Sequence, residues 1–454
     1  MSVLLYTLGI VTFFVAILAS IGLHELGHMI PAKKFGGKVT QYFIGFGPTV
    51  WSKQVGETEY GVKAIPLGGY VKIVGMLPPE ALDVADEVEV DGSGNQVVRV
   101  RKSNTGMFTQ LISDARAAEW ELVKPEDSER LFYKMAWWKK VVVMAGGPSV
   151  NIAIAFFLFW GVFASYGQEV GVVPETGQPV LASVSKCVLP YTEEGRPCTA
   201  QDPPSPAAEA GLLPGDTVTS FNGTTVSDWD QLRVLIRDNA GGNAEIGYVR
   251  DGETLVGATS TTVQARPTSM SDETLTQVGF LGVTPTSRTV KEYGGPIYTL
   301  RQMGTMTLDT AQALVTLPVK VFDVGQAIVG IEDRAIDSPV SIVGGGRLAG
   351  ETTSSTELDV AKKLVFLVLL VAGFNFFIGM FNFLPLLPLD GGHIASALWE
   401  AARRGSARLR GRPDPGYVDA AKLLPLAYVV ASLLLIMGVV LIIGDLVVPL
   451  HLES

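Results

Sequence analysis

The chain has 454 residues, of which 47% are apolar and only 18% are charged, and this balance argues against a compact cytosolic enzyme. A formal net charge of -10 opposes binding to nucleic acid or to anionic lipid through overall charge, and no nucleic-acid motif is present. The two cysteines, Cys187 and Cys198, are too few for a disulfide framework and lack the C-x-x-C spacing of a thiolate metal site.

Four long stretches contain no Asp, Glu, Lys or Arg: residues 1–23, 141–168, 364–389 and 423–444. Each can cross a bilayer, which takes about 20 mostly apolar residues. The first lacks a basic start and a cleavage site and runs into His24 and Glu25, so we interpret it as a retained helix rather than a signal peptide. The sequence therefore predicts a polytopic α-helical membrane protein with four transmembrane helices, at residues 1–31, 139–168, 361–392 and 423–448.

The distribution of basic residues predicts the orientation of these helices. They cluster after the first span, before the second, and between the third and fourth: Lys33, Lys34, Lys38, Lys134, Lys139, Lys140, Arg403, Arg404, Arg408, Arg410 and Arg412. Such ends face the cytoplasm. Residues 169–359 are more acidic than basic and hold both cysteines, so we place them outside, where a disulfide can persist, with free thiols as the alternative. Both chain ends are then extracytoplasmic.

The connections between the spans differ in composition. Within the cytoplasmic loop at 32–138, alternation and glycines predict a membrane-associated β-hairpin at about 55–75, followed by a mobile acidic insertion at 77–129. In the outer connector at 289–360, residues 298–330 favour a helix on the membrane surface over a fifth span. Residues 393–422 are predicted to form a basic cytoplasmic loop, and residues 449–454 a tail.

The outer segment contains a recognisable unit at residues 205–223, SPAAEAGLLPGDTVTSFNG, followed by a predicted helix at 229–236. This pattern resembles a bacterial PDZ domain. The resemblance covers residues 170–288 and implies one extracytoplasmic β-sandwich domain whose groove accepts an extended peptide as an added strand. Residues 186–204, with Cys187 and Cys198, form an extended loop in it that a disulfide would pin.

Two of the four histidines of the chain occur in the sequence HELGH at residues 24–28, at the end of an apolar helix. Positions i and i+4 share one helix face, so His24 and His28 can bind one Zn2+ while Glu25 lies beside a water molecule at the metal. The alternative is a pair of polar side chains where the helix leaves the membrane. Mn2+, Fe2+ and Co2+ can occupy similar sites.

A catalytic zinc site usually has three protein ligands, so a third is needed. Asp390 follows the third uncharged stretch in NFLPLLPLDGGH at residues 382–393, where Pro385 and Pro388 should break the helix. Irregular backbone at membrane depth is tolerated only beside protein or a water-filled cavity, and a carboxylate there is expected to have a functional partner. His393 as a fourth ligand would close the site, so we expect a supporting role for it. His451 is expected to be solvated.

HELGH, IPLGGYVKI at 65–73, GGPSVN at 146–151 and NFLPLLPLDGGH, together with one PDZ-like unit, resemble the site-2 protease family, more narrowly the RseP-type bacterial intramembrane zinc metalloproteases. The resemblance implies one Zn2+ per chain, held by His24, His28 and Asp390, with Glu25 as the catalytic base. It further implies substrate-binding roles for four residues: Asn151, Asn382, Gly68 and Gly69.

Membership of this family implies a multi-pass protein of the bacterial inner membrane. Its substrates would be single-pass membrane proteins, such as anti-sigma factors, cut within or near the bilayer after an upstream site-1 protease has trimmed them. The PDZ-like domain would exclude untrimmed substrates by size or capture new carboxyl termini, and we favour exclusion. Two other classes of function stay open at this stage: a catalytically silent PDZ scaffold, and a metal or ion transporter with intramembrane ionisable residues.

Overall fold

The computed structural model describes residues 2–78, 88–90, 96–98, 107–120, 123–174, 177–191, 197–269, 272–335 and 337–450. Parts of the expected insertion at 77–129, and His451, lie outside the described residues. The chain forms two compact units, one made of Met1–Tyr166 with Gly294–Ser454, and the other of Gly167–Tyr293.

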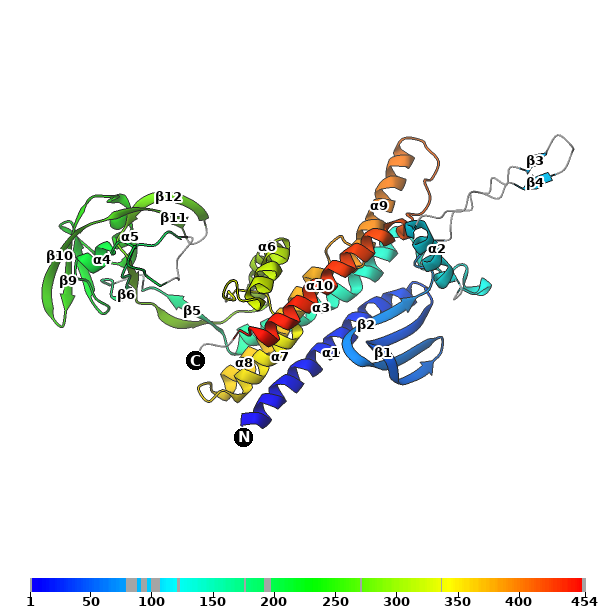
Figure 1. Ribbon diagram of the computed structural model, residues 1–454, viewed down its shortest axis with the longest axis horizontal. Helices are drawn as coiled ribbons and strands as arrows, with labels where there is room; N and C mark the ends of the chain where they lie inside the picture. Colours follow the sequence, from blue (N-terminus) through cyan, green and yellow to red (C-terminus); the bar gives the residue numbers. More distant parts are fainter. Residues whose placement is uncertain are drawn as a thin grey trace. The chain divides into compact units, whose positions relative to one another are not determined.

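Four long apolar helices dominate the first unit: α1 (Ser2–Lys34), α3 (Trp137–Ser165), α8 (Val360–Asn382) and α10 (Leu424–Val447). Among the described residues, these helices are long and apolar enough to cross a membrane, α10 being counted with the turn before it. The four predicted spans are therefore confirmed as candidate membrane spans. In Figure 1 the four helices run along a common direction.

The segment predicted as the third transmembrane helix, residues 361–392, is not one helix. α8 ends at Asn382, an irregular turn follows, and α9 (Asp390–Leu409) begins at Asp390. Pro385 and Pro388 lie in the turn, because proline cannot donate the backbone hydrogen bond that a helix needs. α9 also occupies much of the region that was expected to be a basic loop.

Two further helices precede α8. α6 (Pro296–Ile328) confirms a helix in the connector at 289–360, whereas its outer location on the membrane surface stays a prediction. α7 (Ile342–Ser354) was not predicted, because three successive glycines disfavour a helix. They allow close packing instead: a Cβ added to Gly345 would lie 2.7 Å from the ring of Phe374 and 2.8 Å from that of Phe13 on α1.

The predicted hairpin at 55–75 is wrong in its pairing. Residues Thr58–Ile73 form one strand, β2, whose partner is β1 (Val39–Val55), an N-terminal segment that was not predicted as a strand. The pairing is antiparallel and irregular, so that residues 41–44 have partners both at 69–72 and at 59–62. This curled sheet packs against α1, where Tyr42 Oη donates to the Gly22 carbonyl at 2.8 Å.

The described parts of the expected insertion include the short strands β3 (Val88–Val90) and β4 (Gln96–Val98), helix α2 (Met107–Trp120), and the one-turn helix η1 (Pro125–Asp127). Outside the insertion, one-turn helices also form at η2 (Phe132–Lys134) and η4 (Ala420–Leu423). α2 is tied to the end of β2, because the Glu119 carboxylate accepts from the backbone amides of Gly75 and Met76.

The second unit is built from short antiparallel sheets around two small helices, α4 (Pro206–Glu209) and α5 (Trp229–Asp238). Its largest sheet has the order β10-β9-β7-β8, with strands β10 (Glu253–Ser260), β9 (Asn243–Arg250), β7 (Thr217–Phe221) and β8 (Thr224–Thr225). Pairs of strands complete it: β5 (Gln168–Val172) with β14 (Arg288–Glu292), β6 (Leu181–Val184) with β13 (Val283–Pro285), and β11 (Thr262–Ser269) with β12 (Asp272–Phe280).

An ion pair between the buried Asp216 and the partly exposed Arg250 lies at the start of β7. Arg250 Nε and Nη2 donate to the two carboxylate oxygens of Asp216 at 2.7 and 2.8 Å, and the Leu213 amide donates to Oδ2 at 2.8 Å. Burial by itself would raise the pKa of the Asp216 carboxyl, but these hydrogen bonds to the charged form outweigh it and hold the pKa below its ordinary value.

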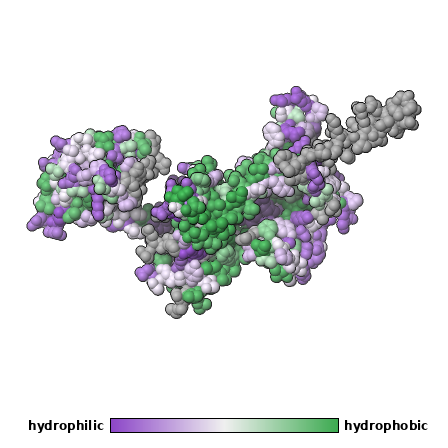
Figure 2. Space-filling view, viewed as in Figure 1, coloured by the Kyte–Doolittle hydropathy of each residue, from purple (hydrophilic) through white to green (hydrophobic). Residues whose placement is uncertain are grey.

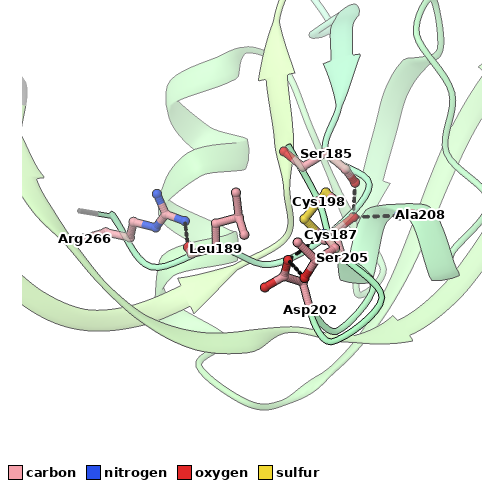
Figure 3. Close-up of a disulfide and its surroundings, with 9 residues drawn as sticks. Ser185, Cys187, Leu189, Cys198, Asp202, Ser205, Ala208 and Arg266 are labelled. Carbon is pink, nitrogen blue, oxygen red and sulfur yellow. Dashed lines mark hydrogen bonds between the residues drawn. A yellow bond between two sulfur atoms is a disulfide. The ribbon is translucent and has the colours of Figure 1, made fainter. Parts of the chain in front are cut away.

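Cys187 and Cys198 form a disulfide in the second unit. Figure 3 shows it beside Ser205, the N-cap residue before α4: the Ser205 hydroxyl donates to the Ser185 carbonyl and accepts from the Ala208 amide. The disulfide therefore closes a loop that leads directly into the start of the PDZ-like sequence pattern.

Candidate metal centre

His24 and His28 lie one helical turn apart on α1, with their Nε2 atoms 3.2 Å from each other. The other ring nitrogen of each is engaged: His28 Nδ1 lies 2.8 Å from the Val143 carbonyl oxygen, and His24 Nδ1 lies 3.3 Å from Asn151 Oδ1. Because both partners are acceptors, each Nδ1 carries the hydrogen. Both Nε2 atoms are then free to present a lone pair.

Asp390, the first residue of α9, supplies the third group. Its Oδ2 lies 3.4 Å from His24 Nε2 and 3.3 Å from His28 Nε2. The turn before α9 is compact because Gly391 and Gly392 have no side chains. A Cβ at Gly391 would lie 2.1 Å from the Leu384 carbonyl oxygen, and one at Gly392 would lie 2.5 Å from the Leu387 backbone nitrogen.

The three donor atoms fit a zinc ion. Tetrahedral coordination with bonds of about 2.0–2.1 Å separates two ligand atoms by about 3.3 Å, and the three separations here are 3.2, 3.3 and 3.4 Å. Two imidazole lone pairs and a carboxylate oxygen facing one another also repel unless a cation lies between them. Among the described residues, these three form the group of histidine and acidic side chains that can hold a metal.

Glu25 follows His24 on α1 and is buried, with 9% of its surface exposed. The curled sheet covers it: a Cβ added to Gly69 on β2 would lie 3.0 Å from Glu25 Cγ. Glycine at this position therefore lets the strand approach the helix closely beside the three donor atoms.

Gly147 on α3 is a site residue that the sequence analysis did not single out. A Cβ there would lie 2.2 Å from His28 Nε2 and 2.7 Å from His24 Nε2. Its neighbour Gly146 is in backbone contact with Gly27, since a Cβ at Gly146 would lie 1.9 Å from the Gly27 carbonyl oxygen. The sequence shows the glycine pair in GGPSVN, but it does not show that this pair packs against α1.

The other predicted site residues lie in different surroundings. Asn151 is 1% exposed and contacts His24. Asn382, half-buried at the end of α8, donates from Nδ2 to the Ile378 carbonyl at 3.1 Å. Gly68 has a φ of +95°, a conformation that favours glycine, and lies against the Phe46 ring. His393 is not part of the donor group found among the described residues.

An H-E-x-x-H pair on a membrane helix, with an aspartate from a second helix completing three donors, is the site of a membrane-embedded metallohydrolase. The comparisons with known proteins specify the family. The family model of Peptidase family M50 matches residues 12–415. The chain is 34% identical to the zinc metalloprotease Rip1 of Mycobacterium tuberculosis over 99% of this chain and 100% of that protein.

Two more distant relatives are similar over most of their length. The putative zinc metalloprotease mll0638 of Mesorhizobium japonicum is 29% identical over 85% of this chain and 87% of that protein. The regulator of sigma-W protease RasP of Bacillus subtilis is 24% identical over 87% of this chain and 90% of that protein. The chain therefore belongs to Peptidase family M50, the site-2 protease family, and is a membrane zinc metalloprotease. This assignment decides for an enzyme over the scaffold and transporter alternatives.

Proposed function

We propose that the protein is an intramembrane endopeptidase in which His24, His28 and Asp390 hold one zinc ion per chain. The observation that carries the proposal is the convergence of their three donor atoms to within 3.4 Å of one another beside Glu25. A zinc ion there supplies Lewis acidity, which polarises a peptide carbonyl and makes water easier to deprotonate.

Glu25 is the general base in this proposal. It takes a proton from the water that attacks the scissile carbonyl and passes it to the leaving amine, so that hydrolysis consumes one water and returns the carboxylate unchanged. Its burial under Gly69 supports the assignment, because contact with the strand limits the positions that the side chain can take.

For Asn151 we propose a role other than substrate binding. The sequence suggested that it binds substrate backbone, but it is almost fully buried and lies 3.3 Å from His24 Nδ1. We therefore assign it as a positioning residue that holds the His24 ring with Nε2 toward the metal. Partners of this kind are typically worth a factor of about 10–100 in metal affinity.

The substrate in this proposal is a membrane segment that unwinds before cleavage, because helical carbonyls are already hydrogen-bonded. Among the described residues, 69–73 of β2 have strand partners on one side only, at 39–44. Their other edge can accept an extended segment next to Glu25, which Gly69 permits by its close approach. Gly68 shapes this edge, and Asn382 is proposed to bind the backbone of the unwound segment.

We further propose that the second unit is a PDZ-like domain on the outer side of a bacterial inner membrane, with both chain ends on that side. It would exclude single-pass substrates until a site-1 protease has shortened them. The name of RasP, a regulator of sigma-W protease, supports a substrate such as an anti-sigma factor. Binding of a trimmed peptide to the full-length protein, lost when its terminal carboxylate is amidated, would instead favour capture.

The deciding experiment measures bound zinc and cleavage of a truncated single-pass substrate by the detergent-purified full chain. Wild type is expected to hold close to one zinc, and His24→Ala and Asp390→Ala are expected to lose both zinc and cleavage. His393→Ala is the matched control, a nearby histidine outside the donor group, and should keep its zinc. Full zinc and activity in Asp390→Ala would overturn the ligand set.

A further inference from the structure

An apolar pocket of about 230 Å³ lies where α9 meets the beginning of α10, on the side of the turn at 385–387. Ala395 of α9 and Leu426 and Val430 of α10 line it, together with Trp399. Leu426 and Val430 belong to the first two turns of α10, a candidate membrane span. The pocket is therefore at the end of a span, where hydrocarbon begins.

A second pocket, of about 450 Å³, adjoins it along α9 and has the opposite character. It is lined by Arg403, Arg410 and Arg412 and shares Trp399 with the apolar pocket. Arg403 belongs to α9, which in Figure 1 extends from the beginning of α10 away from that helix, so the basic pocket lies beyond the end of that span. In Figure 2 hydrophilic surface covers the tip of α9, whereas the long helices below it present hydrophobic surface.

Among the described residues, no carboxylate forms an ion pair with the arginines of this pocket. Of the nearby carboxylates, Asp414 pairs with Arg404, and Glu400 is buried against Lys140. Within the part of the chain that the structure describes, Arg410 and Arg412 form no ion pair. The chain as a whole carries a net charge of -10, so this local excess of positive charge does not reflect a generally basic protein.

We propose that the two pockets together bind one anionic phospholipid. An acyl chain would lie in the apolar pocket against α10, and the phosphate would pair with Arg410 and Arg412, since guanidinium groups match phosphate oxygens. Trp399, 62% exposed between the two pockets, has the amphipathic ring that is typical of the membrane interface. A soluble anion would satisfy the basic pocket and leave the apolar one unused.

The test uses the full-length protein in detergent with phosphatidylglycerol and phosphatidylcholine of identical acyl chains, and counts retained lipids by native mass spectrometry. Each arginine near an anionic lipid is worth about fivefold in binding. The preference of wild type for phosphatidylglycerol should therefore fall about 30-fold in the double variant Arg410→Gln/Arg412→Gln. Lys34→Gln/Lys53→Gln removes two exposed charges elsewhere on the same unit and should keep the preference within about threefold.

Three results would overturn the proposal. Wild type could retain the two lipids equally, which would remove the anionic preference. The lysine control could lose as much preference as the arginine variant, which would indicate diffuse attraction to charge. Inorganic phosphate at millimolar concentration could displace phosphatidylglycerol, which would make the basic pocket a site for soluble anions and leave the acyl chain no role.

Discussion

Replacing Gly147 by alanine tests the metal centre without touching any proposed ligand. The added methyl group would lie 2.2 Å from His28 Nε2 and 2.7 Å from His24 Nε2. Ordinary contact begins at about 3.4 Å, so the His28 ring must shift by about 1.2 Å and the His24 ring by about 0.7 Å. Making room by separating the two helices would break the close backbone approach of Gly146 to Gly27.

The cost in zinc affinity follows from the size of this shift. Metal sites tolerate about 0.2 Å in ligand distances, so a displacement of about 1 Å removes His28 from coordination. Loss of a residue that hydrogen-bonds to a metal ligand already lowers zinc affinity by about 10–100-fold. Loss of a ligand itself should lower zinc affinity by more than 100-fold, which corresponds to about 2.7 kcal/mol. The stability of the helix itself should increase, because alanine in place of glycine stabilises a helix by about 0.5–1 kcal/mol.

Zinc affinity is measured by competition with a chelator, alongside cleavage of the truncated substrate and thermal unfolding of the metal-free protein. Gly161→Ala is the matched control: it lies on the same helix, and a Cβ there would meet no atom within 4 Å. The control should keep wild-type zinc affinity and cleavage. If Gly147→Ala bound zinc within threefold of wild type and cleaved normally, the proposed donor set would be wrong.

Three other outcomes are expected. Glu25→Gln should keep its zinc while cleavage falls by a factor of about 10²–10⁴, and turnover near the wild-type rate would exclude Glu25 as the base. Asn151→Ala should weaken zinc about 10–100-fold in the same chelator competition, whereas unchanged affinity would leave it a packing role only. The lowered pKa of Asp216 means that its pair with Arg250 stabilises the second unit above about pH 4 and is lost on acidification below that. The protection factors of amides in that unit, corrected for the intrinsic exchange rate at each pH, should therefore fall below pH 4 in wild type and much less in Asp216→Asn; an equal fall in both would contradict the reasoning.

Several features of this protein follow from short stretches of sequence. A run of about 20 uncharged residues is enough to predict a membrane span, because the bilayer penalises any charge within it. The i and i+4 spacing of His24 and His28 places both rings on one helix face, whatever the rest of the chain does. The single disulfide was expected as a possibility from the predicted outer location of Cys187 and Cys198.

Other features depend on contacts between distant segments. The strand partner of Thr58–Ile73 was missed because β1 precedes it and pairs through repeated register shifts that no alternation in the sequence shows. The prolines at 385 and 388 correctly predicted a break in the third span, but the span was still extended to residue 392, whereas α8 ends at Asn382. The family resemblance implied that Asn151 binds substrate, and its contact with His24, on which the proposed positioning role depends, is visible only in the folded chain.

The sequence by itself predicted the residues that are proposed to carry the chemistry, because residue type and helical spacing are local properties. Only the tertiary structure brings Asp390 to within 3.4 Å of His24 and sets Gly147 against both histidine rings. These contacts join α1, α3 and α9, and α1 approaches α3 closely because Gly27 and Gly146 have no side chains where the two backbones cross. Such close packing is a property of two surfaces together, and neither segment reveals it alone.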